Sequence, residues 1–145
     1  MRKVITLILM LCAASLYADS KDNMKISINI TSTSGNHNIT ATLVDNSSAK
    51  AFAELLAKGP LTVQMDDYGS FEKVGNLPVS LPRNDTGITT KPGDIILYQG
   101  NKITIYYATN SWSFTRLGKV DDVSPAELRK ILGKDNVTAV FELLK

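Results

Sequence analysis

Few side chains in this sequence carry the chemistry of catalysis or metal binding. The chain of 145 residues contains one histidine, His37, and one cysteine, Cys12. A serine triad would need that single histidine as its general base, yet the sequence has no Gly-x-Ser-x-Gly motif. Phosphate-binding loops and dinucleotide fingerprints are absent as well. We therefore predict no catalytic residue and no cofactor.

Two pairs of adjacent acids, Asp66-Asp67 and Asp121-Asp122, are the remaining candidates for a metal site. A calcium loop needs oxygen ligands that alternate around a glycine, and neither pair has that spacing. Each pair follows a predicted strand in a turn-like setting, where solvated aspartate is common. We predict solvated turn residues at both places and no metal site.

Aromatic residues give the strongest indication of a binding site. Five of them fall close together in the sequence: Tyr98, Tyr106, Tyr107, Trp112 and Phe114. Residues two apart in a strand share a face, so Arg116 is expected beside Phe114. A guanidinium next to aromatic rings suits a groove for a peptide or small molecule. The structural alternative places Tyr107 and Phe114 in the core, with Tyr106, Trp112 and Arg116 at its rim.

The segment from Asp66 to Pro92 is interrupted repeatedly by glycine and proline. Such a segment is either a functional loop or a set of short strands that the pattern does not reveal. Together with the aromatic cluster it would wall a groove. The predicted ligand contacts are Phe71, Glu72, Leu77, Tyr98, Trp112, Phe114 and Arg116.

The elements that would position these residues are mostly strands. Alternating apolar residues predict strands at 26–30, 39–43, 61–65 and 137–143. Two further strands, 95–98 and 102–107, flank the hairpin turn Gln99-Gly100-Asn101, and another covers 114–120.

Two short helices are also expected. The first follows candidate caps at residues 45–48 and ends at Gly59-Pro60. The second has Ser124 as its cap, Pro125 at its first position and Gly133 at its end. Strands that are mostly adjacent in sequence, with two helices, predict an antiparallel barrel or sandwich.

The amino terminus has the layout of a secretory signal peptide. Arg2 and Lys3 precede an apolar run that extends from Val4 to Ala14 and is followed by small residues up to Ala18. The run is too short for a membrane-spanning helix of roughly 20 residues. We predict a signal at 1–18, a single domain at 19–145, and export to the periplasm or the medium. Lipidation of Cys12 is disfavoured, because the large residue Leu11 precedes it.

The charge balance excludes a strongly basic nucleic-acid binder. The chain has 16 Lys and Arg against 14 Asp and Glu. Removal of Arg2 and Lys3 with the signal would leave 14 of each. The protein would then be close to neutral, so attraction of polyanions is not expected to be its main role.

Four stretches of sequence carry a family resemblance through their order and spacing. They are Ala49–Phe52, Glu72–Pro78, Pro92–Asp94 with Leu97-Tyr98, and Tyr106-Tyr107 with Thr115–Gly118. Together they resemble the bacterial cyclophilin-like domain family over residues 24–142. The resemblance implies a mainly β fold: a closed antiparallel β-barrel with two short helices.

The resemblance does not imply the reaction that cyclophilins catalyse. Typical cyclophilins isomerise Xaa-Pro bonds in a groove lined by an arginine, a Phe-Met pair, a glutamine, a tryptophan and a histidine. This sequence has no Phe-Met-x-Gln run, His37 comes too early, and Arg116 and Trp112 are out of order. The prediction is a non-catalytic module that binds a peptide or small ligand. The alternative is a peptidyl-prolyl isomerase in which Arg116 acts as the hydrogen-bond donor.

Overall fold

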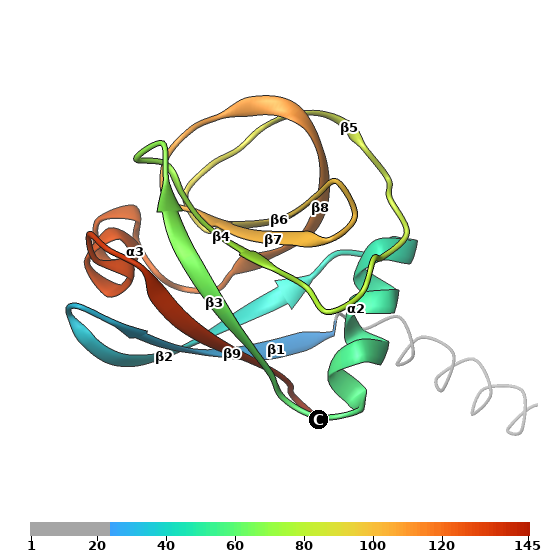
Figure 1. Ribbon diagram of the computed structural model, residues 1–145, viewed down its shortest axis with the longest axis horizontal. Helices are drawn as coiled ribbons and strands as arrows, with labels where there is room; N and C mark the ends of the chain where they lie inside the picture. The colour runs from blue at the N-terminus through green and yellow to red at the C-terminus, as the bar shows by residue number, and fades with distance from the viewer. Residues whose placement is uncertain (1–23) are drawn as a thin grey trace, which may run out of the picture.

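The computed structural model describes residues 24–145, which contain nine strands and two helices (Figure 1). The predicted signal peptide and Cys12 lie outside the described residues. Neither helix is long and apolar enough to cross a bilayer. The strands are β1 (Lys25–Ser32), β2 (Gly35–Leu43), β3 (Leu61–Tyr68), β4 (Glu72–Asn76), β5 (Thr86–Thr89), β6 (Asp94–Tyr98), β7 (Lys102–Tyr106), β8 (Ser111–Val120) and β9 (Val137–Leu143).

Eight of these strands close into an antiparallel barrel, as the resemblance implied. They follow the order β2-β1-β9-β3-β4-β7-β6-β8, and β8 pairs back onto β2. Of the two architectures left open by the strand pattern, the barrel is correct. At the closure Gly118 lies opposite Leu43, and a Cβ on Gly118 would lie 2.5 Å from the Thr42 carbonyl oxygen. A glycine at this position therefore allows the two strands to pair.

Alternating apolar residues of the barrel strands point inward and form the core. Ile26, Ile28 and Ile30 of β1 are fully buried. Phe52, from the helix α2 (Ser47–Ala57), packs edge-on against Phe141 with 5.8 Å between ring centroids. Burial of a large apolar side chain contributes roughly 1.5–3 kcal/mol, so α2 is held mainly by this apolar face.

Both helices begin and end close to the residues expected. The Asn46 side chain caps α2 by accepting a hydrogen bond from Ala49 N at 2.7 Å. The helix α3 (Pro125–Leu132) starts with Ser124, whose hydroxyl accepts from Glu127 N at 3.1 Å. Gly133 ends α3 with a positive φ of 68°, which glycine adopts without strain. In Figure 1 the two helices lie on opposite sides of the molecule.

The segment from Asp66 to Pro92 contains short strands. β3 continues to Tyr68, and β4 follows across a tight turn and pairs with both β3 and β7. Farther along, β5 pairs only with the first half of β8, so it lies outside the closed ring. Of the two readings of this segment, the set of strands is the better description.

The prediction that both acidic pairs are solvated turn residues is wrong for Asp66, Asp67 and Asp121. Asp66 is exposed but lies within β3. Asp67 lies within β3 and accepts hydrogen bonds from Lys73 Nζ at 3.1 Å and from the Tyr107 hydroxyl. Asp121 accepts from Lys25, Thr40 and Thr42. Both aspartates bind side chains of neighbouring strands, which the sequence spacing does not reveal.

Lys73 is a fully buried cation inside this framework. Its ammonium donates to Asp67 Oδ1 at 3.1 Å, to the Gly133 carbonyl at 3.0 Å and to the Asp135 carbonyl at 2.6 Å. Three donors meet three acceptors, so the charge is paired and its hydrogen bonds are satisfied. Through these hydrogen bonds Lys73, on β4, links the loop after α3 to Asp67 of β3.

Candidate functional site

The candidate site lies on the outer face of β4, β7 and β6. Ile95 and Leu97 belong to the large cluster that fills the barrel, whereas Ile96 belongs to a second cluster with Tyr106 and Phe114. This alternation follows from the two-residue period of a strand. Figure 1 shows the first half of β8 and β5 arching away from β6 and β7, above this outer face.

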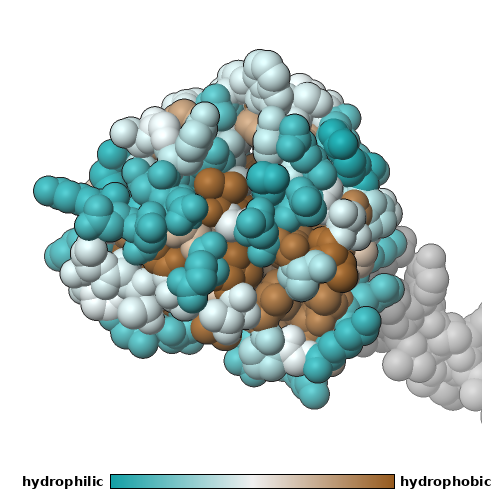
Figure 2. Space-filling model, in the orientation of Figure 1, coloured by the Kyte–Doolittle hydropathy of each residue, from teal (hydrophilic) through white to brown (hydrophobic). Residues whose placement is uncertain are grey.

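A cavity of about 410 Å³ lies between the arch and the sheet, and we call it the aromatic groove. Its lining residues come from the β3–β4 hairpin, from β6 and β7, and from the segment that enters β8. They are Tyr68, Phe71, Glu72, Val74, Tyr98, Lys102, Thr104, Tyr106, Asn110, Trp112 and Phe114. In Figure 2 the hydrophobic surface lies mainly in the middle and lower right of the view, between hydrophilic side chains.

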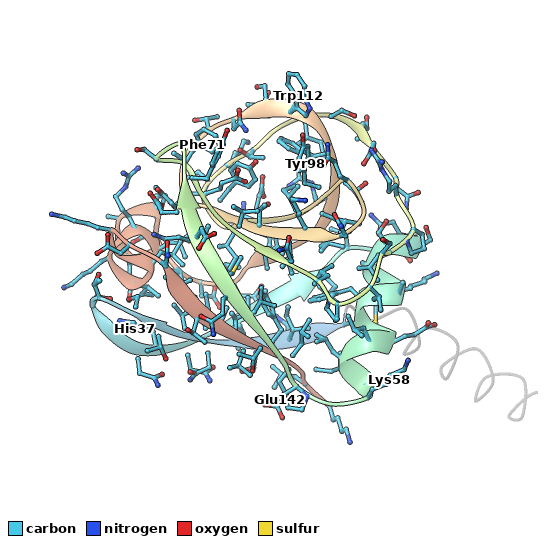
Figure 3. All side chains as sticks on the ribbon, viewed as in Figure 1. His37, Lys58, Phe71, Tyr98, Trp112 and Glu142 are labelled. Carbon is cyan, nitrogen blue, oxygen red and sulfur yellow. The ribbon has the colours of Figure 1, made fainter. Side chains whose placement is uncertain are left out.

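The aromatic rings form a connected wall. Phe71 and Tyr106 are stacked, with centroids 6.0 Å apart and an interplanar angle of 3°. Tyr106 contacts Phe114 at 5.7 Å, and Phe114 contacts Tyr98 at 6.0 Å. Such pairs stabilise one another by about 0.5–1.5 kcal/mol beyond their buried area, so the rings of the wall hold one another in place. Figure 3 shows Phe71, Tyr98 and Trp112 on different sides of this region.

Two residues of the groove are exposed to an unusual degree. Tyr68 is 62% exposed and Trp112 is 64% exposed. They come from opposite walls, the β3–β4 hairpin and the start of β8. Among the residues described, the other exposed large hydrophobics are Val79 and Leu144, at 46% and 43%. Exposed apolar surface next to a cavity is typical of a binding site.

Glu72 is the single acid of the groove and is largely buried. Burial raises the pKa of Glu72, and a hydrogen bond with Tyr106 offsets part of that effect. The pKa of Tyr106 is raised too, mainly by burial. Within residues 24–145, Glu72 takes part in no ion pair. This carboxyl can accept hydrogen bonds when ionised and donate one when protonated.

Five of the seven residues predicted to contact a ligand line the groove. They are Phe71, Glu72, Tyr98, Trp112 and Phe114. Leu77 is buried in the barrel core instead. Arg116 forms an ion pair with Asp94, with 2.8 Å between Nη1 and Oδ1.

The structural alternative for the aromatic cluster is partly wrong. Tyr107 and Phe114 are buried as that alternative expected, and Trp112 is exposed. Tyr106, expected at the rim, is only 1% exposed because it forms part of the groove wall between Phe71 and Phe114. The next residue, Tyr107, lines a different cavity, so the two consecutive tyrosines point to opposite sides of the sheet.

That second cavity, of about 740 Å³, lies beside α3 and the β1–β2 turn. Its lining includes Ser34 and three exposed cations, Arg129, Lys130 and Lys134. Three of the residues that face it contact one another: Tyr107 donates to Asp67, and the Arg129 guanidinium lies 5.3 Å from the centroid of the Tyr107 ring.

Of the catalytic and metal-binding candidates within residues 24–145, only Asp67 lines a cavity, the one beside α3. His37 Nε2 lies 2.9 Å from Ser34 Oγ, on the β1–β2 hairpin. Over the described part of the chain, no three His, Cys, Asp or Glu side chains are grouped to hold a metal ion. The aromatic groove, which five of the seven predicted ligand contacts line, is the stronger candidate site.

A family model described as the cyclophilin-like family matches residues 32–142. The chain belongs to the cyclophilin-like family. A search of curated proteins gives no match. The match includes every residue that lines the aromatic groove of this cyclophilin-like barrel. Since one fold supports many functions, the function must be argued from the groove itself.

Proposed function

We propose that this cyclophilin-like protein is a non-catalytic binding module, with the aromatic groove as the site for a peptide or small molecule. The observation that carries the proposal is the convergence of aromatic rings from separate segments around a cavity of about 410 Å³. Small-molecule sites are typically concave, largely apolar and supplied with few polar groups. Glu72, Lys102, Thr104 and Asn110 would supply those polar groups.

The position of Arg116 favours binding over prolyl isomerisation. Isomerisation would need a donor close to the substrate amide, and Arg116 was the candidate. Its guanidinium pairs with Asp94, and Arg116 does not line the groove.

The single tryptophan of the chain makes the proposal directly testable, since Trp112 lines the groove. A library of peptides and small molecules is screened for a change in tryptophan fluorescence. Each ligand found is then measured by calorimetry against Trp112→Ala, which should weaken binding at least about tenfold. Val79→Ala, an exposed residue outside the groove, is the matched control. Unchanged affinity in Trp112→Ala would contradict the proposal.

We also propose export through the amino-terminal signal. The support is the sequence of residues 1–18, in which a positive start, an apolar run and small residues follow in order. Expression of the full chain in a bacterium, followed by intact-mass measurement of the envelope fraction, tests it. A product that begins at Asp19 is expected. Full-length protein confined to the cytoplasm would contradict it.

A further inference from the structure

The aromatic groove carries its two charged residues at opposite ends. In the β4–β7 pairing Glu72 lies opposite Tyr106, and Asn76 lies opposite Lys102. The two charges are therefore four residues apart along the strands, or about 13 Å at the usual rise per residue. Lys102 is too far away to neutralise Glu72, and the two form no ion pair.

The surroundings of Glu72 lack a positive charge and are rich in aromatic rings. An ionised carboxylate that is buried without a cation is costly, so it either takes up a proton or acquires a positive partner. The ring faces of tryptophan and tyrosine attract organic cations for a separate electrostatic reason. Trp112 is available for this purpose because most of its surface is exposed. Both features select the same kind of ligand.

We propose that the aromatic groove recognises an organic cation, an ammonium or guanidinium group whose nitrogen pairs with Glu72 and whose carbon atoms lie among the rings. This inference rests on the proposed binding function. Lys102 disfavours a cation at its own end of the groove, so the cationic end of the ligand is expected at the Glu72 end. The cation belongs either to a small amine or to a basic side chain of a peptide.

Two matched pairs of probes distinguish these sources. The first pair is 2-phenylethylammonium and 2-phenylethanol. The second is a blocked tripeptide with a central lysine and the same peptide with norleucine. Binding is followed at neutral pH through Trp112 fluorescence. We expect the cationic member of at least one pair to bind about tenfold more tightly than its neutral counterpart.

Two variants then test whether the preference for the cationic probe depends on Glu72. Glu72→Gln keeps the shape and hydrogen-bonding capacity of the side chain, so it should retain the neutral probe and reduce the cation preference to within about twofold. Lys102→Gln changes the other charge of the groove and should preserve the preference. A thermal melt of each variant checks that it is folded.

The outcomes separate this inference from the proposed function. Equal affinities within both pairs, a preference that survives in Glu72→Gln, or no binding of any probe would overturn cation recognition. The binding function itself fails only if ligands from the wider screen bind Trp112→Ala as tightly as wild type.

Discussion

The guanidinium of Arg116 holds the carboxylate of Asp94 across β6 and β8, with 2.8 Å between Nη1 and Oδ1. Asp94 is almost fully buried, and its second oxygen accepts a hydrogen bond from Lys91 N at 2.9 Å. A buried carboxylate without a partner is strongly unfavourable. Arg116 therefore supports the barrel at the point where the arch of β8 leaves it.

Arg116→Ala should consequently lower stability without removing the groove. We expect a loss of about 2 kcal/mol in the free energy of unfolding, because the Asp94 charge loses its cation. Trp112→Ala, at an exposed position, should change stability by no more than about 0.5 kcal/mol. Urea denaturation of both variants measures the difference. An Arg116→Ala protein of unchanged stability that no longer binds groove ligands would assign Arg116 to the site.

Prolyl isomerase activity should be absent. A protease-coupled assay on a proline tetrapeptide is expected to give the uncatalysed rate, because the one arginine considered as donor is committed to Asp94. The uncatalysed barrier of about 18–20 kcal/mol sets the background rate with which the measured rate is compared. A faster isomerisation rate in wild type that returns to background in Trp112→Ala would instead support prolyl isomerase activity in the groove.

Lys73→Met should be among the most destabilising substitutions in the protein. It removes the cation that serves Asp67 and two backbone carbonyls, and it leaves the Asp67 charge without a positive partner. The expected loss is about 3 kcal/mol of unfolding free energy. Lys130→Met, at an exposed position on α3, is the control and should change stability little. A Lys73→Met protein as stable as this control would show that the buried cation is dispensable.

Glu72 should make stability depend on pH. Its pKa in the folded protein is raised above the ordinary value of 4.5, chiefly by burial. As pH rises through 4.5, the carboxyl ionises first in the unfolded chain, so the folded state becomes relatively less stable until the folded pKa is passed. Wild type should therefore lose stability relative to Glu72→Gln as pH increases across this window.

Denaturation of both proteins from pH 3.5 to about 7 measures this trend. Glu142→Gln removes the charge of an exposed glutamate on β9 and controls for the change in net charge. A difference between wild type and Glu72→Gln that does not vary with pH, or varies in the opposite direction, would mean that Glu72 is not desolvated.

Much of the fold follows from local patterns in the sequence. Strands with one buried face, such as β1 and β9, alternate visibly because only every second residue enters the core. Local caps likewise determine where α2 and α3 begin. β4 has no such alternation, because both its faces are partly covered. Lys73 and Gly75 lie toward the barrel, while Glu72 and Val74 line the groove.

The site was predicted in part for a related reason. Five groove residues could be selected for two reasons. Aromatic residues concentrate near β8, and Phe71 and Glu72 lie in the segment that glycine and proline interrupt. Six lining residues were not among the predicted contacts. Tyr68, Val74, Lys102, Thr104 and Tyr106 require the register of β3, β4 and β7, and Asn110 lies between β7 and β8. The partners of Arg116 and Lys73 likewise depend on contacts that parity along one strand does not show.

The division of β8 has a consequence for local unfolding. Its second half, Gly118 to Val120, pairs with β2 and closes the barrel, whereas Ser111 to Phe114 pairs with the short strand β5 outside the ring. The hydrogen bonds between β5 and residues 111–114 can open while the pairing of β8 with β2 stays intact. One continuous strand therefore belongs to two cooperative units. Amide hydrogen exchange should accordingly be fast near Trp112 and slow near Gly118, and an occupied groove should slow only the first of these.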